Sequence, residues 1–387
     1  MWLLVIALVA GLSLVAAGCG GDDDDEGTGT DTTATSGECD KSVWVLLPDA
    51  ATSPRWETDD RRYFEEELTE AGVDFTIVNS EGQATTQQSQ AEQAINDDAG
   101  VVILSSNDSG SGATIIEQLQ EADVPVIEYD RFNTGGPGGD AYVSFDNVAV
   151  GATMAETLEP EIDALDVDTP AVFMLNGGEE DNNAFLFRDG YAATVEAKVD
   201  AGDWELVDDQ FVPGWGANGE GQQIMEQVLT DNNNKVDAVF AANDNLATQA
   251  INALEAAGVG PVPMSGQDAS AAGIQQIILG TQTMTVYKPI QAEADVAAKA
   301  ALALCAGETD LSTVESEYDF ATIGINAEDG KPADTPTGEG VVPYLALTPI
   351  GVTEDNIMDT VIADEFRTIE EVCTGDTADT DFCKENG

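Results

Sequence analysis

A complete strand–helix–strand unit occupies residues 100–131, GVVILSSNDSGSGATIIEQLQEADVPVIEYDR. Its two apolar runs, GVVILS (100–105) and VPVIEY (124–129), are rich in Val and Ile, which favour strands. The longer segment between them has the spacing of apolar residues that is typical of a helix. Strands that alternate with helices in this way predict an α/β fold with a parallel sheet.

The same alternation continues along the chain from residue 42. Two helical segments are 85–95 and 247–257, and Gly258 ends the second of them. The pattern runs twice, with about four units before residue 140 and about five after it, which predicts two doubly wound lobes with parallel sheets. The other expected strands are 42–47, 74–79, 141–145, 170–175, 205–212, 236–242, 262–266 and 282–287.

The composition excludes several classes of function. Among 387 residues, 74 are Asp or Glu, 13 are Lys or Arg and none is His, so the formal net charge is -61. Such a chain cannot neutralise a run of phosphates, and it has no His for a Ser/His/Asp or Cys/His nucleophile. With 42% apolar residues it can still form a packed core. A surface this acidic is best tolerated at high ionic strength, which indicates a salt-adapted, halophilic host.

The first residues of the chain indicate export. Residues 1–18, MWLLVIALVAGLSLVAAG, are uncharged and predict a signal peptide, and the run LVAAGC (14–19) resembles the lipobox of bacterial lipoproteins. Cys19 would then carry the lipid, and the alternatives are a plain secretory signal or a short membrane anchor. Residues 19–41 are acidic and predict a flexible tether. The globular part is therefore expected on the extracellular face of the cell membrane, or in the periplasm.

Four more cysteines follow Cys19, and their even number predicts two disulfides in an exported chain. Three connectivities are possible. We favour Cys373 with Cys383, which closes a short polar loop, and therefore Cys39 with Cys305. A zinc site is the alternative, but the spacing contains no CxxC pair and no His is present, so no metal is predicted.

Polar and charged residues follow several of the predicted strands. In an open α/β sheet, ligands bind beyond the carboxyl ends of the strands, so these side chains predict a shared site. Arg55, Arg131 and Lys288 lie at such positions although the chain has only 13 cationic side chains. The residues that follow other strands are Asp130, Asn182, Asn183, Asn243, Asp244, Gln267 and Asp268.

A site of this composition suits a neutral sugar. Carboxylates accept hydrogen bonds from sugar hydroxyls, and Arg, Lys and Asn side chains donate them. The apolar faces of a sugar ring pack on aromatic rings, for which Trp56 and Trp215 are the candidates.

The chain also resembles a known family in a series of ordered motifs. They are RW (55–56), YDR (129–131), SFDN (144–147), DNNA and LFR within 181–188, GW (214–215), NNNKVDAV (232–239), ND (243–244), SGQDA (265–269) and GTQTMTVYKPI (280–290). Their order and spacing, from about Val43 to about Phe366, resemble the D-xylose-binding proteins of bacterial ABC transporters, in the ribose-binding-like branch of periplasmic sugar-binding proteins.

The resemblance implies a periplasmic-binding-protein fold of type I, in which two lobes joined by three crossings close over the sugar. The crossings are expected near residues 144, 288 and 317. The expected parts are a first lobe of 42–144 plus 288–317, a second lobe of 145–287 plus 318–366, and a polar C-terminal tail, 367–387. The residues implied to hydrogen-bond the sugar are Arg55, Asp130, Arg131, Asn183, Asn243, Asp268 and Lys288, and those implied to stack on it are Trp56 and Trp215.

Purely structural roles are the alternatives for these residues. Asp130 and Arg131 could form a surface ion pair, the two tryptophans could pack in the core, and Lys288 could serve the hinge alone. Asn182 is a candidate helix cap, and we expect Asp244 rather than Asn243 to cap the helix that follows it.

We therefore expect a lipid-anchored receptor, not an enzyme, that captures D-xylose by lobe closure and delivers it to the permease of an ABC transporter. No cofactor is expected: Gly214, Gly216 and Gly219 spell G-x-G-x-x-G, but the bulky Trp215 speaks against a dinucleotide site. A monomer is expected. The alternatives are a receptor for ribose, arabinose, glucose or galactose, an extracellular hydrolase with two carboxylates, and a repressor-type sensor core.

Overall fold

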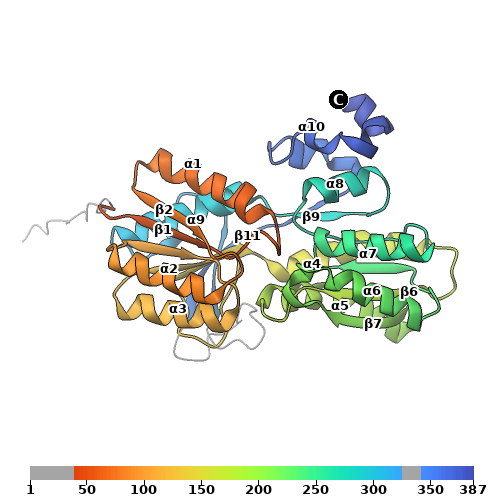
Figure 1. Cartoon of the computed structure of the whole chain (residues 1–387), viewed down its shortest axis with the longest axis horizontal. Helices are drawn as coiled ribbons and strands as arrows, with labels where there is room; N and C mark the ends of the chain where they lie inside the picture. Colours follow the sequence, from red (N-terminus) through yellow and green to blue (C-terminus); the bar gives the residue numbers. More distant parts are fainter. Residues whose placement is uncertain (1–38, 325–340) are drawn as a thin grey trace, which may run out of the picture. The chain divides into compact units, whose positions relative to one another are not determined.

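The structure, a computed structural model, describes residues 39–324 and 341–387. A seven-stranded sheet forms the centre of the first lobe, with the strand order β10-β11-β5-β4-β3-β1-β2 (Figure 1). All neighbouring strands pair in parallel except β10 and β11. The strands are β1 (Val43–Leu47), β2 (Phe75–Asn79), β3 (Val101–Leu104), β4 (Val126–Tyr129), β5 (Ala141–Phe145), β10 (Asp319–Gly324) and β11 (Val341–Leu347).

Helices cover both faces of this sheet. Helices α1 (Arg61–Ala71) and α9 (Ile290–Cys305) pack on one face, and α2 (Ala84–Asn96) and α3 (Ser109–Glu121) pack on the other. Because successive side chains of a strand point to opposite faces, β1 contributes to both cores. Val43, Val45 and Leu47 lie in the core of the first pair of helices, and Trp44 and Leu46 lie in the core of the second.

The second lobe is built on three parallel strands in the order β7-β6-β8. The predicted strand 262–266 is reduced to a single bridge between Met264 and Val239. The strands are β6 (Ala171–Asn176), β7 (Glu205–Phe211) and β8 (Ala238–Ala241), and the helices are α4 (Asn147–Asp163), α5 (Asn182–Ala201), α6 (Glu220–Asp231), α7 (Asp244–Ala257) and α8 (Ala271–Ile278).

Three crossings connect the lobes, and one of them differs from the expectation. The chain passes from β5 to α4, from β9 (Thr285–Tyr287) to α9, and from β11 to β12 (Ile350–Val352), which pairs with β9. The third crossing therefore lies after Leu347 and not near residue 317.

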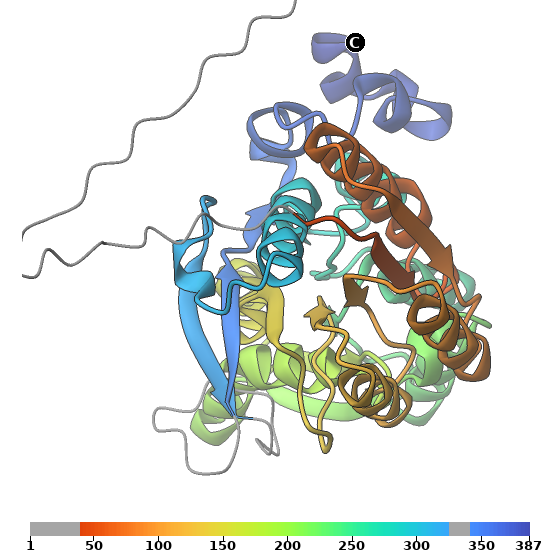
Figure 2. The same cartoon turned by 90° about the vertical axis from the view of Figure 1, so that its left-hand side faces the viewer.

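The expected second-lobe segment 318–366 is accordingly wrong for its first half. Strands β10 and β11 belong to the first-lobe sheet, and Figure 2 shows them side by side at its edge. The physical reason is that β11 buries apolar side chains on both faces: Tyr344 stacks on Tyr142 of β5 with ring centroids 4.8 Å apart, and Leu345 is fully buried on the opposite face.

The C-terminal segment that was expected to be a polar tail is folded. It contains α10 (Ile369–Val372) and α11 (Asp381–Asn386), and Val372 and Cys383 are buried. Disulfides join Cys373 to Cys383 and Cys39 to Cys305, which is the pairing favoured from the sequence.

The predicted signal peptide, Cys19 and most of the predicted tether fall in residues 1–38, outside the described part of the chain. In the two described ranges, none of the helices combines the length and the apolar character needed to span a membrane.

Candidate functional site

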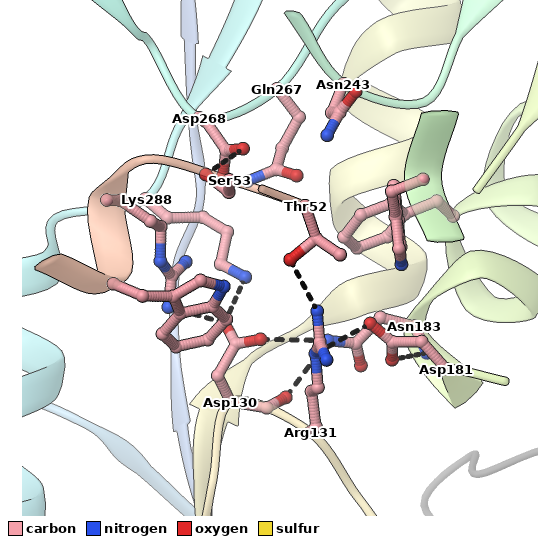
Figure 3. Close-up of a pocket in the computed structure, with 14 residues that line it drawn as sticks. Thr52, Ser53, Asp130, Arg131, Asp181, Asn183, Asn243, Gln267, Asp268 and Lys288 are labelled. Carbon is pink, nitrogen blue, oxygen red and sulfur yellow. Dashed lines mark hydrogen bonds and ion pairs between the residues drawn. The ribbon is translucent and has the colours of Figure 1, made fainter. Parts of the chain in front are cut away.

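One pocket brings together all nine residues that the sequence predicted for the site (Figure 3). It is lined from both lobes, because the carboxyl ends of the parallel strands of each sheet face this region. The predicted residues in the lining are Arg55, Trp56, Asp130, Arg131, Asn183, Trp215, Asn243, Asp268 and Lys288.

Arg55 and Trp56 come from the loop after β1 and the π-helical turn η1 (Trp56–Asp60). The Arg55 guanidinium forms a two-bond fork with Asp60, with Nε 3.0 Å from Oδ2 and Nη2 3.2 Å from Oδ1. Tyr129 donates a further hydrogen bond to Asp60 Oδ1 over 2.7 Å. The Arg55 guanidinium carbon lies 4.2 Å from the centre of the Trp56 ring. A buried acid therefore fixes the guanidinium beside the indole before any ligand binds.

Asp130 is the electrostatic centre of the pocket. Its Oδ2 lies 2.5 Å from Lys288 Nζ and 3.1 Å from Arg55 Nη2, and its Oδ1 accepts a hydrogen bond from Asn183 Nδ2 over 3.1 Å. Burial raises the pKa of Asp130, but Arg55 and then Lys288 outweigh that effect and hold it well below its usual value. Asp130 is therefore a permanently ionised acceptor, and not one partner of a surface ion pair.

Arg131 and Asp181 form a second buried ion pair, with Nε 2.9 Å from Oδ2. Asp181 also caps α5, because its side chain accepts a hydrogen bond from the backbone N–H of Asn183. The N-cap of α5, for which Asn182 was the candidate, is therefore the preceding residue, Asp181. This leaves Asn182 as the first helical residue, outside the pocket lining.

The expected division of roles between Asn243 and Asp244 is wrong in one respect. Asn243, not Asp244, caps α7, because its Oδ1 accepts a hydrogen bond from Leu246 N over 2.9 Å. Asn243 still lines the pocket, where its amide nitrogen remains to donate. Asp244 is buried and accepts hydrogen bonds from the side chains of Ser270, Gln282 and Thr285. Burial raises its pKa to about 6.

Trp215 lies on the short turn η2 (Pro213–Gly216) of the second lobe. Its ring is placed directly against Gly177, where an added Cβ would come within 2.4 Å of a ring carbon. Phe187 meets the same ring edge to face at 6.0 Å. The indole nitrogens of Trp56 and Trp215 are both buried, and neither has a hydrogen-bond partner in the described part of the chain. Because buried N–H groups are normally paired, both donors call for an acceptor on a bound ligand.

Three residues of the lining have an unusual backbone conformation. Asp130, Trp215 and Asp268 have positive φ values of 61°, 51° and 97°, a region that residues other than Gly seldom adopt. Strained residues of this kind persist where the surrounding structure holds them for a functional reason.

Direct contacts between the lobes close the pocket. Ser53 Oγ of the first lobe donates to Asp268 Oδ2 of the second over 2.9 Å, and Ser109 N donates to Glu180 O over 3.2 Å. The free volume inside is about 30 Å³, which is room for about two water molecules. A sugar is larger than this volume, so the walls of the pocket must move apart before one can bind here.

The charges of the lining balance. Three cations, Arg55, Arg131 and Lys288, face three carboxylates. In the described residues, no group of three or more Cys, Asp or Glu side chains is arranged to hold a metal ion. The pocket thus offers charged donors and acceptors in equal number without favouring a charged ligand.

Sequence reasoning missed four residues of the lining and did not commit to a fifth. Asp181 lies in the matched stretch 181–188, and Gln267 follows a predicted strand end, so both carried a signal. Phe187 belongs to the LFR motif of the same stretch, so it carried that signal too. Thr52 and Ser53 lie in the loop after β1, where nothing in the sequence distinguishes them from ordinary residues.

Comparison of the sequence with known proteins matches the chain to periplasmic binding proteins. A family model described as "Periplasmic binding protein domain" matches residues 44–309. The D-xylose-binding periplasmic protein of Escherichia coli (strain K12) is 38% identical over 316 residues, which cover 81% of this chain and 87% of that protein. The D-xylose-binding periplasmic protein of Haemophilus influenzae is 36% identical over 322 residues, which cover 82% of this chain and 88% of that protein.

Solved structures agree with the fold. A carbohydrate transporter solute binding protein from Chloroflexus aurantiacus, in complex with D-glucose, aligns with a TM-score of 0.72 and 27% identity, over 85% of this chain and 97% of that chain. An ABC transporter solute binding protein from Clostridium phytofermentans aligns with a TM-score of 0.74 and 24% identity, over 86% of this chain and all of that chain.

Proposed function

The chain belongs to the periplasmic binding protein family, as a sugar-binding component of ABC transporters, and we propose that its ligand is D-xylose. The observation that carries the proposal is the convergence of all nine predicted side chains, from both lobes, on one pocket. The two relatives at 36–38% identity are D-xylose-binding proteins, which favours this pentose over other sugars.

The chemistry of the lining supports a neutral polyol. Each sugar hydroxyl can donate one hydrogen bond and accept two, so it can meet a carboxylate and a cation together. Asp130 and Asp268 supply acceptors, and Arg55, Arg131 and Lys288 supply charged donors. Charge-assisted hydrogen bonds are shorter and stronger than neutral ones, so a sugar in this pocket would be held firmly in spite of its lack of charge.

Capture would proceed by hinge closure. A sugar enters the open form, and only the closed form gives it contacts from η1 of the first lobe and from η2 and α7 of the second. Ligand binding therefore shifts the population toward the closed form. A permease that recognises the closed form would then receive only loaded receptor.

Selectivity would depend on how closely the lobes fit around the bound sugar. Glucose would require room for an extra hydroxymethyl group beside the ring, and an epimer would leave one charged partner without its hydroxyl. Glucose is nevertheless the main competitor, since the Chloroflexus aurantiacus protein at 27% identity holds D-glucose.

Calorimetric titration with D-xylose, D-ribose, L-arabinose and D-glucose at high salt tests the assignment. D-xylose is expected to bind most tightly. Equal or tighter binding of ribose, arabinose or glucose would overturn xylose as the ligand, and a failure of all four to bind would overturn the function itself. When aryl xylosides are incubated with the protein, we expect no hydrolysis, whether or not they bind.

Anchoring and assembly complete the proposal. Cys19 would carry the lipid after cleavage of residues 1–18, and the stretch from there to Cys39, where the disulfide to Cys305 joins the globular part, would tether a monomeric receptor to the outer face of the cell membrane. A Cys19→Ser variant is expected to lose incorporation of a labelled fatty acid and to leave the membrane fraction. Retention of the label by that variant would exclude Cys19 as the anchor.

A further inference from the structure

A guanidinium outside the pocket touches both lobes at once. Arg367 lies in the segment between β12 and α10, and its Nη1 and Nη2 lie 3.1 and 3.3 Å from the two carboxylate oxygens of Asp59 in η1 of the first lobe. Its Nε donates to the backbone oxygen of Ala269, in the second lobe, over 2.9 Å. One side chain thus forms three hydrogen bonds across the junction of the lobes.

Both ends of this bridge adjoin residues of the proposed sugar site. Asp59 belongs to the same short turn as Trp56, and it follows Arg55 by four residues. Ala269 directly follows Asp268, and both have positive φ values, 45° and 97°. A hydrogen bond to the carbonyl of Ala269 helps to hold this strained pair in place. The guanidinium therefore braces, from the outside, the two loops that present sugar-binding side chains from opposite lobes.

Arg367 is itself fixed by the folded C-terminal segment. Its guanidinium carbon stacks 3.8 Å from the centre of the Phe366 ring, and Nη1 also donates to Phe366 O over 2.9 Å. Phe366 packs on Tyr287 of β9 with ring centroids 4.9 Å apart. Beyond it, Gln275 of α8 donates to Glu371 O over 2.8 Å. Because the guanidinium is held in place in advance, little side-chain freedom is lost when the bridge forms.

Arg367 is the cation that pairs closely with Asp59, with Nη1 3.1 Å from Oδ1. The side chain of Asp59 is buried, and within residues 39–324 and 341–387 the other cation near it is Arg62, whose Nη2 is 3.8 Å away on a side chain that is 43% exposed. Separation of the lobes moves Asp59 away from Ala269, so Arg367 cannot keep both partners in the open form. Opening therefore costs either the ion pair with the buried Asp59 or the hydrogen bond to Ala269 O, and only the closed form keeps both.

We propose that Arg367 is a positioning residue for sugar capture, which stabilises the closed form by bridging Asp59 and Ala269 and thereby slows release of the bound sugar. This inference rests on the proposed function. Because the sugar first meets the open form, where the bridge is broken, removal of Arg367 accelerates dissociation and leaves association nearly unchanged.

Stopped-flow tryptophan fluorescence on the full chain tests the inference with Arg367→Gln, Asp59→Asn, the double variant and Arg62→Gln as the matched surface control. We expect each single variant to raise the dissociation rate constant of D-xylose about tenfold, with an association rate constant within about twofold of wild type. The double variant is expected to match the single ones, because both remove the same bridge. Arg367→Lys is expected to be intermediate, and Arg62→Gln is expected to resemble wild type.

Several outcomes contradict the proposal. An unchanged dissociation rate in Arg367→Gln and Asp59→Asn, or effects that multiply in the double variant, would overturn the bridge while the sugar-binding function stands. If wild type binds none of the aldoses, the function fails, and this inference fails with it. Circular dichroism checks that each variant is folded. If Arg367→Gln does not fold, Asp59→Asn still tests the bridge, because it removes the other partner of the ion pair.

Discussion

The ammonium of Lys288 lies 2.5 Å from Oδ2 of Asp130, and both side chains are almost wholly buried. Lys288 follows β9 at one crossing between the lobes, and Asp130 follows β4 at the end of a first-lobe strand. Together with Arg55, which contacts the same oxygen, this pair links the hinge to the centre of the pocket. The ion pair is thus part of the proposed ligand site and not of the protein surface.

Asp130→Asn is expected to reduce affinity for D-xylose by about a hundredfold or more, because it removes the buried carboxylate that Lys288 and Arg55 share. Titration calorimetry measures the loss. Asp163→Asn is the matched control, since Asp163 pairs with Lys198 at the exposed surface. That control is expected to change neither affinity nor stability by more than about 1 kcal/mol. Similar affinities for wild type and Asp130→Asn would exclude Asp130 from the site.

Trp215→Ala is expected to weaken binding by about 2 kcal/mol, roughly thirtyfold, through loss of the ring that would cover the sugar. Trp215→Phe keeps a ring and loses only the unpartnered indole N–H, so its effect is expected to be smaller. Trp204→Phe serves as control, because Trp204 is buried in the second-lobe core away from the pocket. An affinity within twofold of wild type for Trp215→Ala would show that this indole only packs the core.

The location of the pocket could be predicted because it depends on local features. Strand ends are visible in the sequence, and Asp130, Arg131 and Lys288 follow directly from them. The cap of α7 could not be predicted, since Asn and Asp both make good caps. The choice of Asn243 depends on Ser270 and Thr285, which engage Asp244 from 26 and 41 residues away. Non-local contacts of this kind leave no local signal.

The third lobe boundary could not be predicted for the same reason, because it depends on contacts between residues far apart in the sequence. The position of β11 beside β5 is a pairing between residues about 200 positions apart, such as Tyr344 with Tyr142. The segment 318–366 was therefore assigned to the wrong lobe over its first half. Arg367 likewise lies in a stretch that looks like an ordinary polar tail, and only the folded chain places it next to Asp59.

Glu128 is expected to make stability depend on pH in a defined direction. Its carboxylate is fully buried in β4 and accepts hydrogen bonds from Asn133 and Gly139, and burial raises its pKa from 4.5 to about 7. Below the unfolded pKa, both states are protonated and the contribution to stability is fully present. As the pH rises toward 7, the unfolded state ionises while the folded state keeps its proton, so this contribution is lost.

Compared with Glu128→Gln, wild type is therefore expected to lose about 3 kcal/mol of unfolding free energy between pH 4.5 and about 7.5. Denaturant unfolding of both proteins at three pH values measures this difference. The comparison isolates Glu128, because all other carboxylates that titrate in this range are the same in wild type and in the variant. A wild type that gains stability relative to the variant over this range would contradict the assignment.

The surface charge predicts that salt stabilises the fold. With a formal net charge of -61, repulsion between carboxylates destabilises the compact state at low ionic strength. The midpoint of thermal unfolding is expected to rise by several degrees between about 0.1 M and 1 M NaCl, as the screening length falls from about 10 Å to about 3 Å. A neutral osmolyte of equal osmotic strength separates screening from general exclusion effects. A midpoint that is flat or falls with salt would contradict a salt-adapted surface.

The structure of the complex with D-xylose, determined at high salt, tests the central claim most directly. The account predicts one sugar in the pocket between the lobes, with its oxygens within hydrogen-bond distance of Asp130 and Arg131 and of Asn243 and Asp268, and with the rings of Trp56 and Trp215 against its faces. A sugar that contacts one lobe alone, or that binds outside this pocket, would contradict it.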